Sequence, residues 1–453
     1  MVVADQTPLI LGVPLSLWFT RKHTTVAFGL AFFLIGVLLH QGAPTPITSQ
    51  TKVQLEGTVV QVPRVYNDAY QVTAIESDTN LYKVEMGTAD NLDLGDRVRL
   101  SGTLRPFKEV EEEFWRAQGG RGVLKANSAV ILAHGPLIYR WGGAWRRSFT
   151  SFCETHFDPV VASTVDALTF NVDWFLDDEL REDLRRTGTL HIISASGFHV
   201  VMMFAAIGFV LIRLPLPRWV QILVIALVLL VYAGAAGLRP PVVRAVLMAL
   251  LGASAYLFKR ETDWPSALAA TALVYLVCSP RAIYDLGFQL SYVTVFAISI
   301  GMGDYRPSLR EGFIARRFDD LKQGFKVSLI ATVGSAPLVA YHFGTVSLVG
   351  PVANVLIALV VAIIIVVALS FHALSFGLPE PFLFLGDMIV GLGVSYLHAV
   401  VRLLGSFRYS AIEIVGFNGY WLIPVYAGLL ATWRSKPRPP ESSYLADSAP
   451  WRT

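Results

Sequence analysis

The feature that most constrains this chain is a series of polar signatures set inside long apolar runs. They are His191–Val200, Pro240–Ala245 and Asp285–Ser291. An ionisable side chain at the centre of a bilayer costs at least about 2.5 to 3.5 kcal/mol on insertion scales. Several such side chains close together in the sequence therefore predict a shared polar path or a buried polar network. They are the first candidates for function.

Composition sets the broad class of the protein. Hydrophobic residues make up 54% of the 453 residues and charged residues 16%, and the mean hydropathy is +0.52. A soluble globule of this length is not so apolar, so the chain is predicted to be a polytopic α-helical membrane protein. The net charge of +3 is too small to indicate nucleic acid by itself. Two cysteines are too few for a disulfide framework, and pairing of Cys153 with Cys278 stays open.

The chain divides into five predicted segments. These are a transmembrane anchor at 1–45, a small all-β domain of OB-like type at 46–135, a bridging amphipathic segment at 136–190, a transmembrane helical domain at 191–433 and a polar tail at 434–453. Within the β-domain, alternating runs at 53–62, 70–75, 81–86, 97–104 and 122–131 are separated by turn residues, which predicts five short strands. The stretch Leu94–Gly102 is similar to a strand entry of an OB-fold, a five-stranded barrel.

About ten membrane spans are predicted. The first lies at 25–40, and the others lie at 197–212, 219–236, 242–258, 266–280, 283–301, 327–343, 349–371, 384–404 and 417–432. With ten spans, fifteen Lys and Arg residues up to Arg438 fall in inside segments and three in the short outside loops, namely Arg239, Arg281 and Arg408. Cytoplasmic loops carry an excess of basic residues, so both termini are predicted inside and the β-domain outside.

The three signatures, in this order and spacing, resemble those of the ComEC family of competence membrane proteins. The resemblance continues through Ala336–Gly344, Ser347 and Asn354, so it covers roughly residues 184–366. It implies a channel, not an enzyme, that conducts single-stranded DNA across the inner (cytoplasmic) membrane during natural transformation. It implies no cofactor. The β-domain is similar to the extracytoplasmic OB-like domain of that family.

The resemblance also implies partners beyond single-stranded DNA and membrane lipid. These are a DNA receptor protein, a cytoplasmic DNA-translocating ATPase and a separate nuclease, and a homo-oligomer stays open. Family members often carry a C-terminal metallo-β-lactamase-like domain, whereas this chain ends about twenty residues after its last predicted span and holds no H-x-H-x-D-H cluster. We therefore expect a short form whose nuclease, where there is one, is another protein. The stretch 9–19 is too short and Pro-interrupted to count as a span, which leaves the N-terminal topology open.

Seven residues are predicted to line a DNA conduit. They are His191, Ser194, Ser196, Gly197, His199, Arg239 and Arg244. For the histidines, the alternative is an interhelical hydrogen-bond cluster that only holds the bundle together. For Arg244, the alternative is a side chain that snorkels to the membrane surface. A phosphate contact is the functional interpretation, because a guanidinium stays charged and is weakly hydrated.

Five further polar residues are predicted to form a gating or structural network. They are Asp285, Gln289, Ser291, His342 and Asn354. A carboxylate suits pairing with Arg244 or another basic residue better than contact with DNA. The signature at 191–200 lacks the G-x-S-x-G elbow of a serine hydrolase, since Ser194 stands at its first glycine position. Two histidines eight apart without carboxylates do not predict a metal site.

The β-domain gives a weaker DNA signal. Its candidate DNA contacts are Arg97, Arg99, Arg105, Tyr66 and Tyr82. Between Lys52 and Lys125 there are ten basic and twelve acidic residues, a net charge of −2. Affinity for a polyanion comes largely from neutralised phosphates, so weak or partner-assisted binding is expected.

Two alternative functions come from other classes. The first is a secondary transporter of a small solute with a midplane Arg244 and Asp285 site, which predicts inverted repeats that the sequence does not show. The second is an envelope assembly protein whose membrane part only anchors the β-domain, which leaves the buried polar motifs without a purpose. No Walker motif is present, so energy for transport is expected from a separate motor or from the proton gradient.

Overall fold

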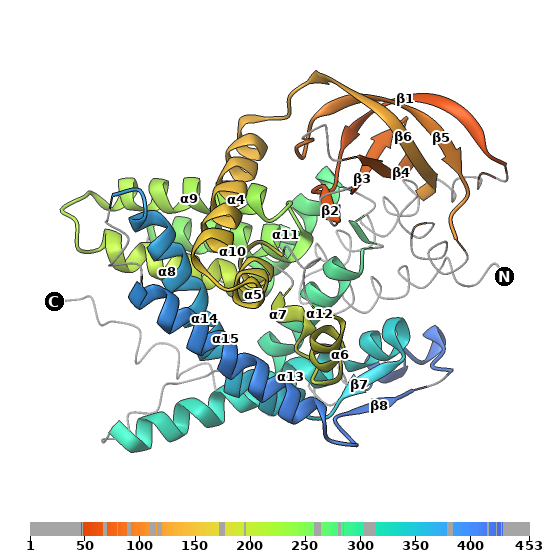
Figure 1. Ribbon diagram of the computed structural model, residues 1–453. Helices are drawn as coiled ribbons and strands as arrows, with labels where there is room; N and C mark the ends of the chain where they lie inside the picture. Colours follow the sequence, from red (N-terminus) through yellow and green to blue (C-terminus); the bar gives the residue numbers. More distant parts are fainter. Residues whose placement is uncertain are drawn as a thin grey trace.

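The structure is a computed structural model that combines a strand-rich domain with a helical body (Figure 1). The residues that it describes are 47, 49–66, 70–78, 80–87, 92–108, 115, 120–171, 177–193, 196–257, 264–279, 282–283, 285–302, 313–377, 384–414, 416–422, 424–426 and 428. The predicted first span at 25–40 and the polar tail at 434–453 lie outside the described residues, as does Ser194.

The strand-rich domain contains six strands. They are β1 (Thr51–Val59), β2 (Arg64–Tyr66), β3 (Tyr70–Ser77), β4 (Asn80–Gly87), β5 (Arg97–Arg105) and β6 (Gly120–Ala133). Their order is β1-β5-β6-β4-β3-β2, and β1 also pairs with β3, which closes the strands into a ring. β4 and β6 run parallel, and the other neighbours are antiparallel. Five strands match the predicted runs, because strict alternation places one face of each strand in the core. The short β2 is an addition.

The helical body follows β6. Its elements are α4 (Leu137–His156), α5 (Pro159–Phe170), α6 (Asp178–Arg186), α7 (Leu190–Ile193), α8 (Gly197–Leu211), α9 (Arg218–Ala235), α10 (Pro240–Leu257), α11 (Trp264–Cys278), α12 (Leu286–Met302), α13 (Phe313–Phe343), β7 (Thr345–Ser347), α14 (Gly350–Leu374), α15 (Phe384–Gly405), β8 (Ala411–Glu413) and η4 (Gly419–Trp421). The helices α8 to α15 lie where spans are predicted, and β7 pairs with β8. In the predicted span at 417–432 the structure describes residues 417–422, 424–426 and 428, and the described residues after η4 are helical.

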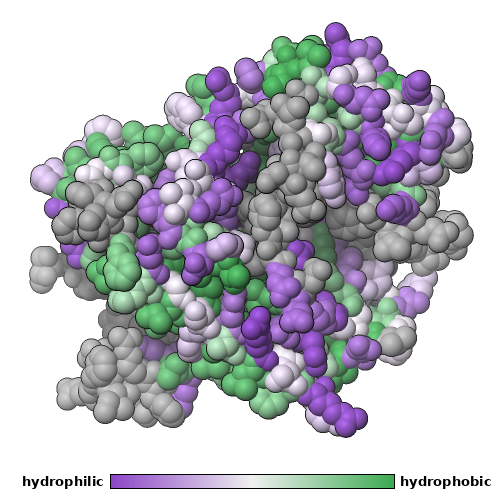
Figure 2. Space-filling view, viewed as in Figure 1, coloured by the Kyte–Doolittle hydropathy of each residue, from purple (hydrophilic) through white to green (hydrophobic). Residues whose placement is uncertain are grey.

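Four described helices are long and apolar enough to cross a membrane. They are α9, α14, α15 and the part Asp319–Phe343 of α13. The helices α5, α8, α10, α11 and α12 are apolar but shorter, with 10–17 residues in the apolar stretch. Figure 2 shows large apolar areas over the helices at the left and hydrophilic side chains over the β-domain at the upper right. The helical body is therefore that of a membrane protein, while the predicted count of ten spans is not confirmed.

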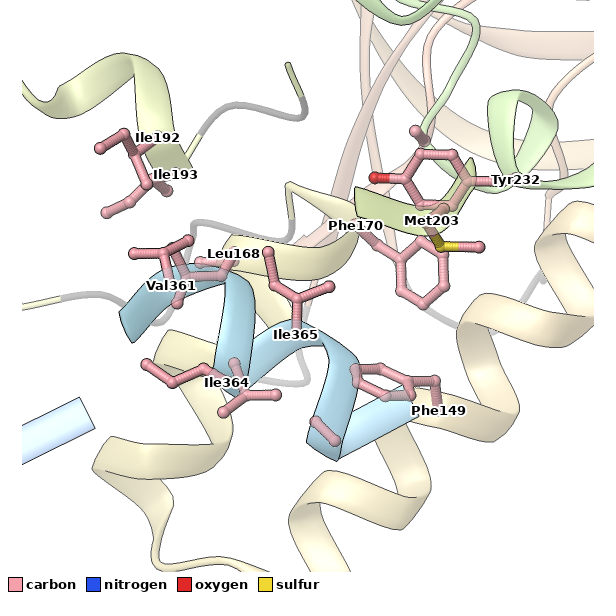
Figure 3. Packing of buried hydrophobic residues seen from close by; sticks show 14 of the residues in the cluster. Phe149, Leu168, Phe170, Ile192, Ile193, Met203, Tyr232, Val361, Ile364 and Ile365 are labelled. Atoms are coloured by element: carbon pink, nitrogen blue, oxygen red, sulfur yellow. The ribbon is translucent and has the colours of Figure 1, made fainter. Parts of the chain in front are cut away.

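The segment at 136–190 is part of the core of the helical body, not only a bridge. Phe149 of α4 and Leu168 and Phe170 of α5 are buried with Tyr232 of α9 and Ile365 of α14 (Figure 3). Phe149 and Phe170 meet edge to face, with ring centroids 5.3 Å apart. The spacing Phe149, Phe152, Cys153 places the apolar side chains of α4 on one face. Cys153 is buried and Cys278 is exposed, and both are free thiols.

Small residues let α4 and α9 cross closely. A Cβ at Gly142 would meet the backbone of Gly234 and Ala235, as at the small-residue contacts of membrane helices. We expect Gly142→Leu to lower the stability by about 1–3 kcal/mol, because the extra side chain overpacks this crossing. Thermal unfolding of the purified protein in detergent checks the effect. Ala144→Leu, at an exposed position of the same helix, is the control, and an equal loss in both variants would contradict the explanation.

A buried carboxylate fixes the β-domain to α4. Asp96 is 1% exposed, and its two oxygens accept hydrogen bonds from the backbone N–H groups of Gly135 and Asp93, each at 2.9 Å. Asp93 in turn pairs with Arg147 of α4. The β-domain is therefore attached to the helical body through contacts of these two carboxylates near the end of β6.

Loss of the Asp96 carboxylate is expected to loosen this mounting. In Asp96→Ala two buried N–H groups lose their acceptor, which costs about 2–3 kcal/mol. The junction at Gly135 should then become sensitive to limited proteolysis, and the melting temperature should fall. Asp96→Asn keeps one acceptor and should lie between Asp96→Ala and the parent protein. Glu154→Ala, at an exposed position of α4, should leave the cleavage pattern unchanged.

Candidate functional site: a cavity beneath the β-domain

A cavity of about 2330 Å³ lies between the β-domain and the helical body. Its lining begins at the β-domain with Val62, Lys83 and Trp115 and continues along α8, α10, α12, α13 and α14. The N-terminal residues of four of these helices, α8, α10, α12 and α14, belong to the lining. Helix N-termini carry partial positive charge. The cavity is therefore surrounded by positive helix ends as well as by side chains.

Arg244 lies in the cavity wall, held by neighbours from two helices. Its side chain is 7% exposed. Nε donates a hydrogen bond to Ser291 Oγ at 2.8 Å, and Nη1 lies 3.4 Å from the sulfur of Met248. The guanidinium carbon lies 5.9 Å from the centre of the Tyr292 ring. Arg244 therefore points inward instead of snorkelling outward, and Ser291 is the residue that fixes its direction.

The start of α8 brings Ser196 and Gly197 to the cavity and turns His199 away from it. His199 is fully buried and is not among the described residues of the lining. Its Nδ1 accepts a hydrogen bond from the Ser196 backbone N–H at 2.9 Å, so His199 closes the N-terminal turn of the helix. Nδ1 is therefore unprotonated in the neutral ring, and the proton is on Nε2. Nε2 has no hydrogen-bond partner among the described residues.

His191 lies on α7 and reaches the cavity. Its Nδ1 lies 3.0 Å from the carbonyl oxygen of Gly188, which makes Nδ1 the donor and leaves Nε2 as an acceptor in the neutral ring. Gly188 has a φ of +69°, and a Cβ there would lie 2.8 Å from the side chain of Ser347. This tight turn sets the position of His191. Arg239 also lines the cavity, and its carbonyl accepts the first helical N–H bonds of α10, from Val242 and Val243.

Asp285 caps α12. Its Oδ1 accepts the backbone N–H of Phe288 at 2.9 Å, and it lines the cavity with Ser291. The predicted pairing of Asp285 with Arg244 is not among the ion pairs of the described residues. Gln289 donates from its amide to the carbonyl of Ile283 at 2.9 Å, which ties the first turn of α12 to the preceding loop.

The two remaining residues of the predicted network, Asn354 and His342, have different surroundings. Asn354 of α14 lines the cavity and donates to Ser328 Oγ at 3.0 Å, which links α13 to α14. His342, at the end of α13, is exposed and stacks edge-on against Tyr341 with ring centroids 4.8 Å apart. It is not among the described residues of the cavity lining.

Two arginines of the lining were not predicted from the sequence. Arg146 reaches the cavity from α4 and Arg185 from α6. Arg185 also donates two hydrogen bonds of 2.7 Å to Glu182, which hold the pKa of the Glu182 carboxyl below its usual range. Both arginines belong to amphipathic helices of the 136–190 segment. The sequence pattern that could have indicated them is an arginine beside the apolar face of a helix. The sequence does not show, however, which helix lines the cavity.

Four of the five candidate DNA contacts of the β-domain lie in ion pairs or in the core. Arg99 pairs with Glu56 at 2.6 Å and Arg105 with Glu85 at 2.6 Å. Arg97 also lies 3.7 Å from Glu56. Tyr82 is 5% exposed and belongs to the core of the domain, so it offers almost no ring surface to a base. The backbone of Tyr66 lies in β2.

The charges of the described lining are unequal. Five cationic side chains, Lys83, Arg146, Arg185, Arg239 and Arg244, stand against two carboxylates, Asp285 and Asp320. Six aromatic residues also belong to the lining, namely Trp115, Phe170, Phe198, Phe204, Tyr275 and Phe343. No group of three or more His, Cys, Asp or Glu side chains in the described part of the chain could hold a metal ion. The lining thus suits an anionic, partly aromatic ligand.

The match to a known family falls on the helical body. The profile of the family described as competence protein matches residues 168–438. ComE operon protein 3 of Bacillus subtilis (strain 168) is 28% identical over 211 residues, which cover 47% of this chain and 26% of the relative. An uncharacterized protein of Aquifex aeolicus (strain VF5) is 31% identical over 166 residues, or 36% of each chain. The matches thus span about a quarter to a third of the relatives' lengths. No solved structure matches the chain. The family profile covers more than half of the sequence, and the chain belongs to the ComEC family of competence proteins.

Proposed function

We propose that this protein conducts single-stranded DNA across the cytoplasmic membrane during natural transformation. The observation that carries the proposal is the composition of the cavity wall. Cationic residues outnumber carboxylates by five to two among the described lining residues, and six aromatic residues belong to the same lining. Two of the five cations, Lys83 and Arg185, are paired with Glu85 and Glu182, which lie outside the lining. Proteins that bind single strands without sequence preference combine a positive groove with aromatic rings on which bases stack.

The rest of the lining suits passage more than tight binding. Hydroxyl and amide side chains extend along α12, α13 and α14, including Ser291, Thr294, Ser328, Thr332 and Asn354. Such groups exchange hydrogen bonds with a moving strand and add no charge. Strong phosphate contacts all along the wall would stall the strand. The extended backbone of Ser196 before α8 and the Pro240-Pro241 start of α10 fit a membrane protein in which irregular backbone lines a water-filled cavity.

The β-domain is assigned to the outside of the membrane and both termini to the cytoplasm, as the basic loops favour. Its ring of strands, with β1 between β3 and β5 and the parallel pair β4 and β6, supports an OB-like barrel. Because Arg99 and Arg105 are ion-paired, we assign it weak or partner-assisted DNA binding. Val62, Lys83 and Trp115 face the cavity, which makes the domain a cover over the entry.

Partners supply what the chain lacks in this scheme. The sequence holds no Walker motif, so the proposal assigns the energy to a cytoplasmic DNA-translocating ATPase or to the proton gradient. A DNA receptor would deliver the strand, and a separate nuclease would remove the other strand. A solute transporter built on Arg244 and Asp285 gains no support from the geometry, since Asp285 caps α12.

Deletion of the gene in a transformable host tests the proposal. Labelled donor DNA is followed in two compartments, outside the inner membrane and in the cytoplasm. We expect DNA to accumulate outside while none enters the cytoplasm, because the conduit is missing while capture continues. Restoring the gene should restore entry. Unchanged cytoplasmic entry in the deletion strain would overturn the proposal.

A further inference from the structure

Arg244 is a buried cation that has no ion-pair partner among the residues that the structure describes. Its described hydrogen bonds go to a hydroxyl, Ser291 Oγ, and to a thioether, Met248 Sδ. Among the described residues no carboxylate oxygen lies within 4.0 Å of its nitrogens. A buried charge is costly unless it is paired and hydrogen-bonded. The pairing group is therefore to be sought in the cavity, which Arg244 lines.

The free edge of this guanidinium faces the start of α8. A Cβ built on Gly197 would lie 2.8 Å from Nη2 of Arg244, so Nη2 occupies the space that the glycine leaves open. Gly197 is the first residue of α8, a helix of 15 residues. The first N–H groups of a helix have no partner within the helix, and its N-terminus favours negative charge. In α8 the N–H of His199 already donates to the carbonyl of Ser196 at 3.1 Å, which leaves the N–H groups of Gly197 and Phe198 for a ligand. Nη2 and the N-terminus of α8 thus meet at one point of the cavity wall.

We propose that Arg244 and the N-terminal turn of α8 form an oxyanion site that takes one phosphate group of the DNA backbone at a time. The inference rests on the proposed function, and it adds which chemical group of the DNA is bound and where in the cavity it is bound. A guanidinium and helix N–H groups together match the oxygens of a phosphate. The site reads the charge of the backbone and not the identity of the base. A single phosphate site of this kind positions the strand in the cavity without binding it along its whole length.

Gly197 is a positioning residue of this site. Any side chain there displaces Nη2, because the nearest side-chain atom of the neighbourhood is that nitrogen. Gly197→Ala therefore keeps the charge of Arg244 but moves it away from the N-terminus of α8. His199 supports the same geometry, since its Nδ1 holds the backbone N–H of Ser196 just before the helix. Ser291 supports it from the other side.

Binding measurements on the full chain in lipid nanodiscs test the site. The probe is a labelled single strand of about 12 nucleotides, titrated at salt concentrations between about 50 and 200 mM. Each neutralised phosphate of a single strand adds about 0.7 to the slope of log affinity against log salt. In Arg244→Met we expect the slope to fall by about 0.7 and the affinity by about tenfold. Arg244→Lys should keep the slope, and Gly197→Ala should weaken binding while Arg244 is intact.

The matched control is Arg213→Met. Arg213 follows α8, is exposed and stacks on Phe209, and is not among the described residues of the cavity lining. The Arg213→Met variant should show the same salt slope and the same affinity for the strand as the parent protein. A second probe, the same strand with uncharged methylphosphonate linkages, should bind the parent protein and Arg244→Met equally.

The outcomes separate this site from the proposed function. An unchanged salt slope in a folded Arg244→Met protein overturns the oxyanion site, even where the deletion strain fails to take up DNA. A slope that falls as expected supports the site, even where the deletion strain still takes up DNA and the channel proposal fails. Equal losses in Arg244→Met and Arg213→Met would show a general charge effect and overturn the site.

Discussion

Replacing Gly252 by tryptophan is expected to stop delivery of DNA to the cytoplasm while the protein still folds. Gly252 lies on α10 in the lining of the cavity, and a Cβ there would meet no heavy atom within 4 Å. An indole at this position therefore extends into the cavity without overpacking a helix contact. Cytoplasmic labelled DNA should fall to the level of the deletion strain, and donor DNA should accumulate outside the inner membrane.

Two controls make this result specific. Gly208 on α8 also has no heavy atom within 4 Å of its Cβ position, but it is not among the described residues of the cavity lining. Gly208→Trp adds the same side chain to a neighbouring helix and should leave uptake near the parent level. Gly252→Ala adds only a methyl group and should do the same. Normal uptake by a membrane-inserted Gly252→Trp protein would place the DNA path outside this cavity.

The regular elements were predictable because each follows from a local pattern. The strands of the β-domain alternate between buried and exposed positions, as along β5 with its pattern of arginine, valine, arginine and leucine from Arg97 to Leu100. The helices from α8 to α15 follow from continuous apolar runs. The number of spans is different, because a run of 15 to 18 residues is compatible with a buried helix, a short span or a re-entrant segment.

The site was predictable in residue type but not in arrangement. Arg244 and Ser291 are polar groups in apolar runs, yet their contact joins residues 47 apart in the sequence, and no local pattern encodes it. His199 looked equivalent to His191, but the helix start at Gly197 turns the two rings to different surroundings. Arg146 was missed because a single sequence does not show that α4 enters the core.

Exchange of Arg244 for methionine is expected to separate stability from transport. Methionine fills a similar volume without charge, and because Arg244 has no ion-pair partner among the described residues, its removal leaves no unpaired buried charge behind. The melting temperature of Arg244→Met should therefore stay the same or rise. Transport of DNA should decrease, because the cavity loses a charged hydrogen-bonding group that contributes about 1.5 to 3 kcal/mol to binding of the strand. We expect cytoplasmic uptake of labelled DNA to fall by about 10- to 100-fold.

The comparison with Arg244→Lys and Arg213→Met decides whether Arg244 contacts the DNA strand or only holds α10 to α12. A lysine keeps the charge but loses the forked geometry, so uptake should lie between the parent and Arg244→Met. Arg213→Met removes an exposed charge outside the described lining and should transport normally. If Arg244→Met melts several degrees lower and loses transport in proportion, the arginine holds α10 to α12 through Ser291 and has no part in conduction. A stable Arg244→Met protein with full uptake would instead mean that the strand passes without using this charge.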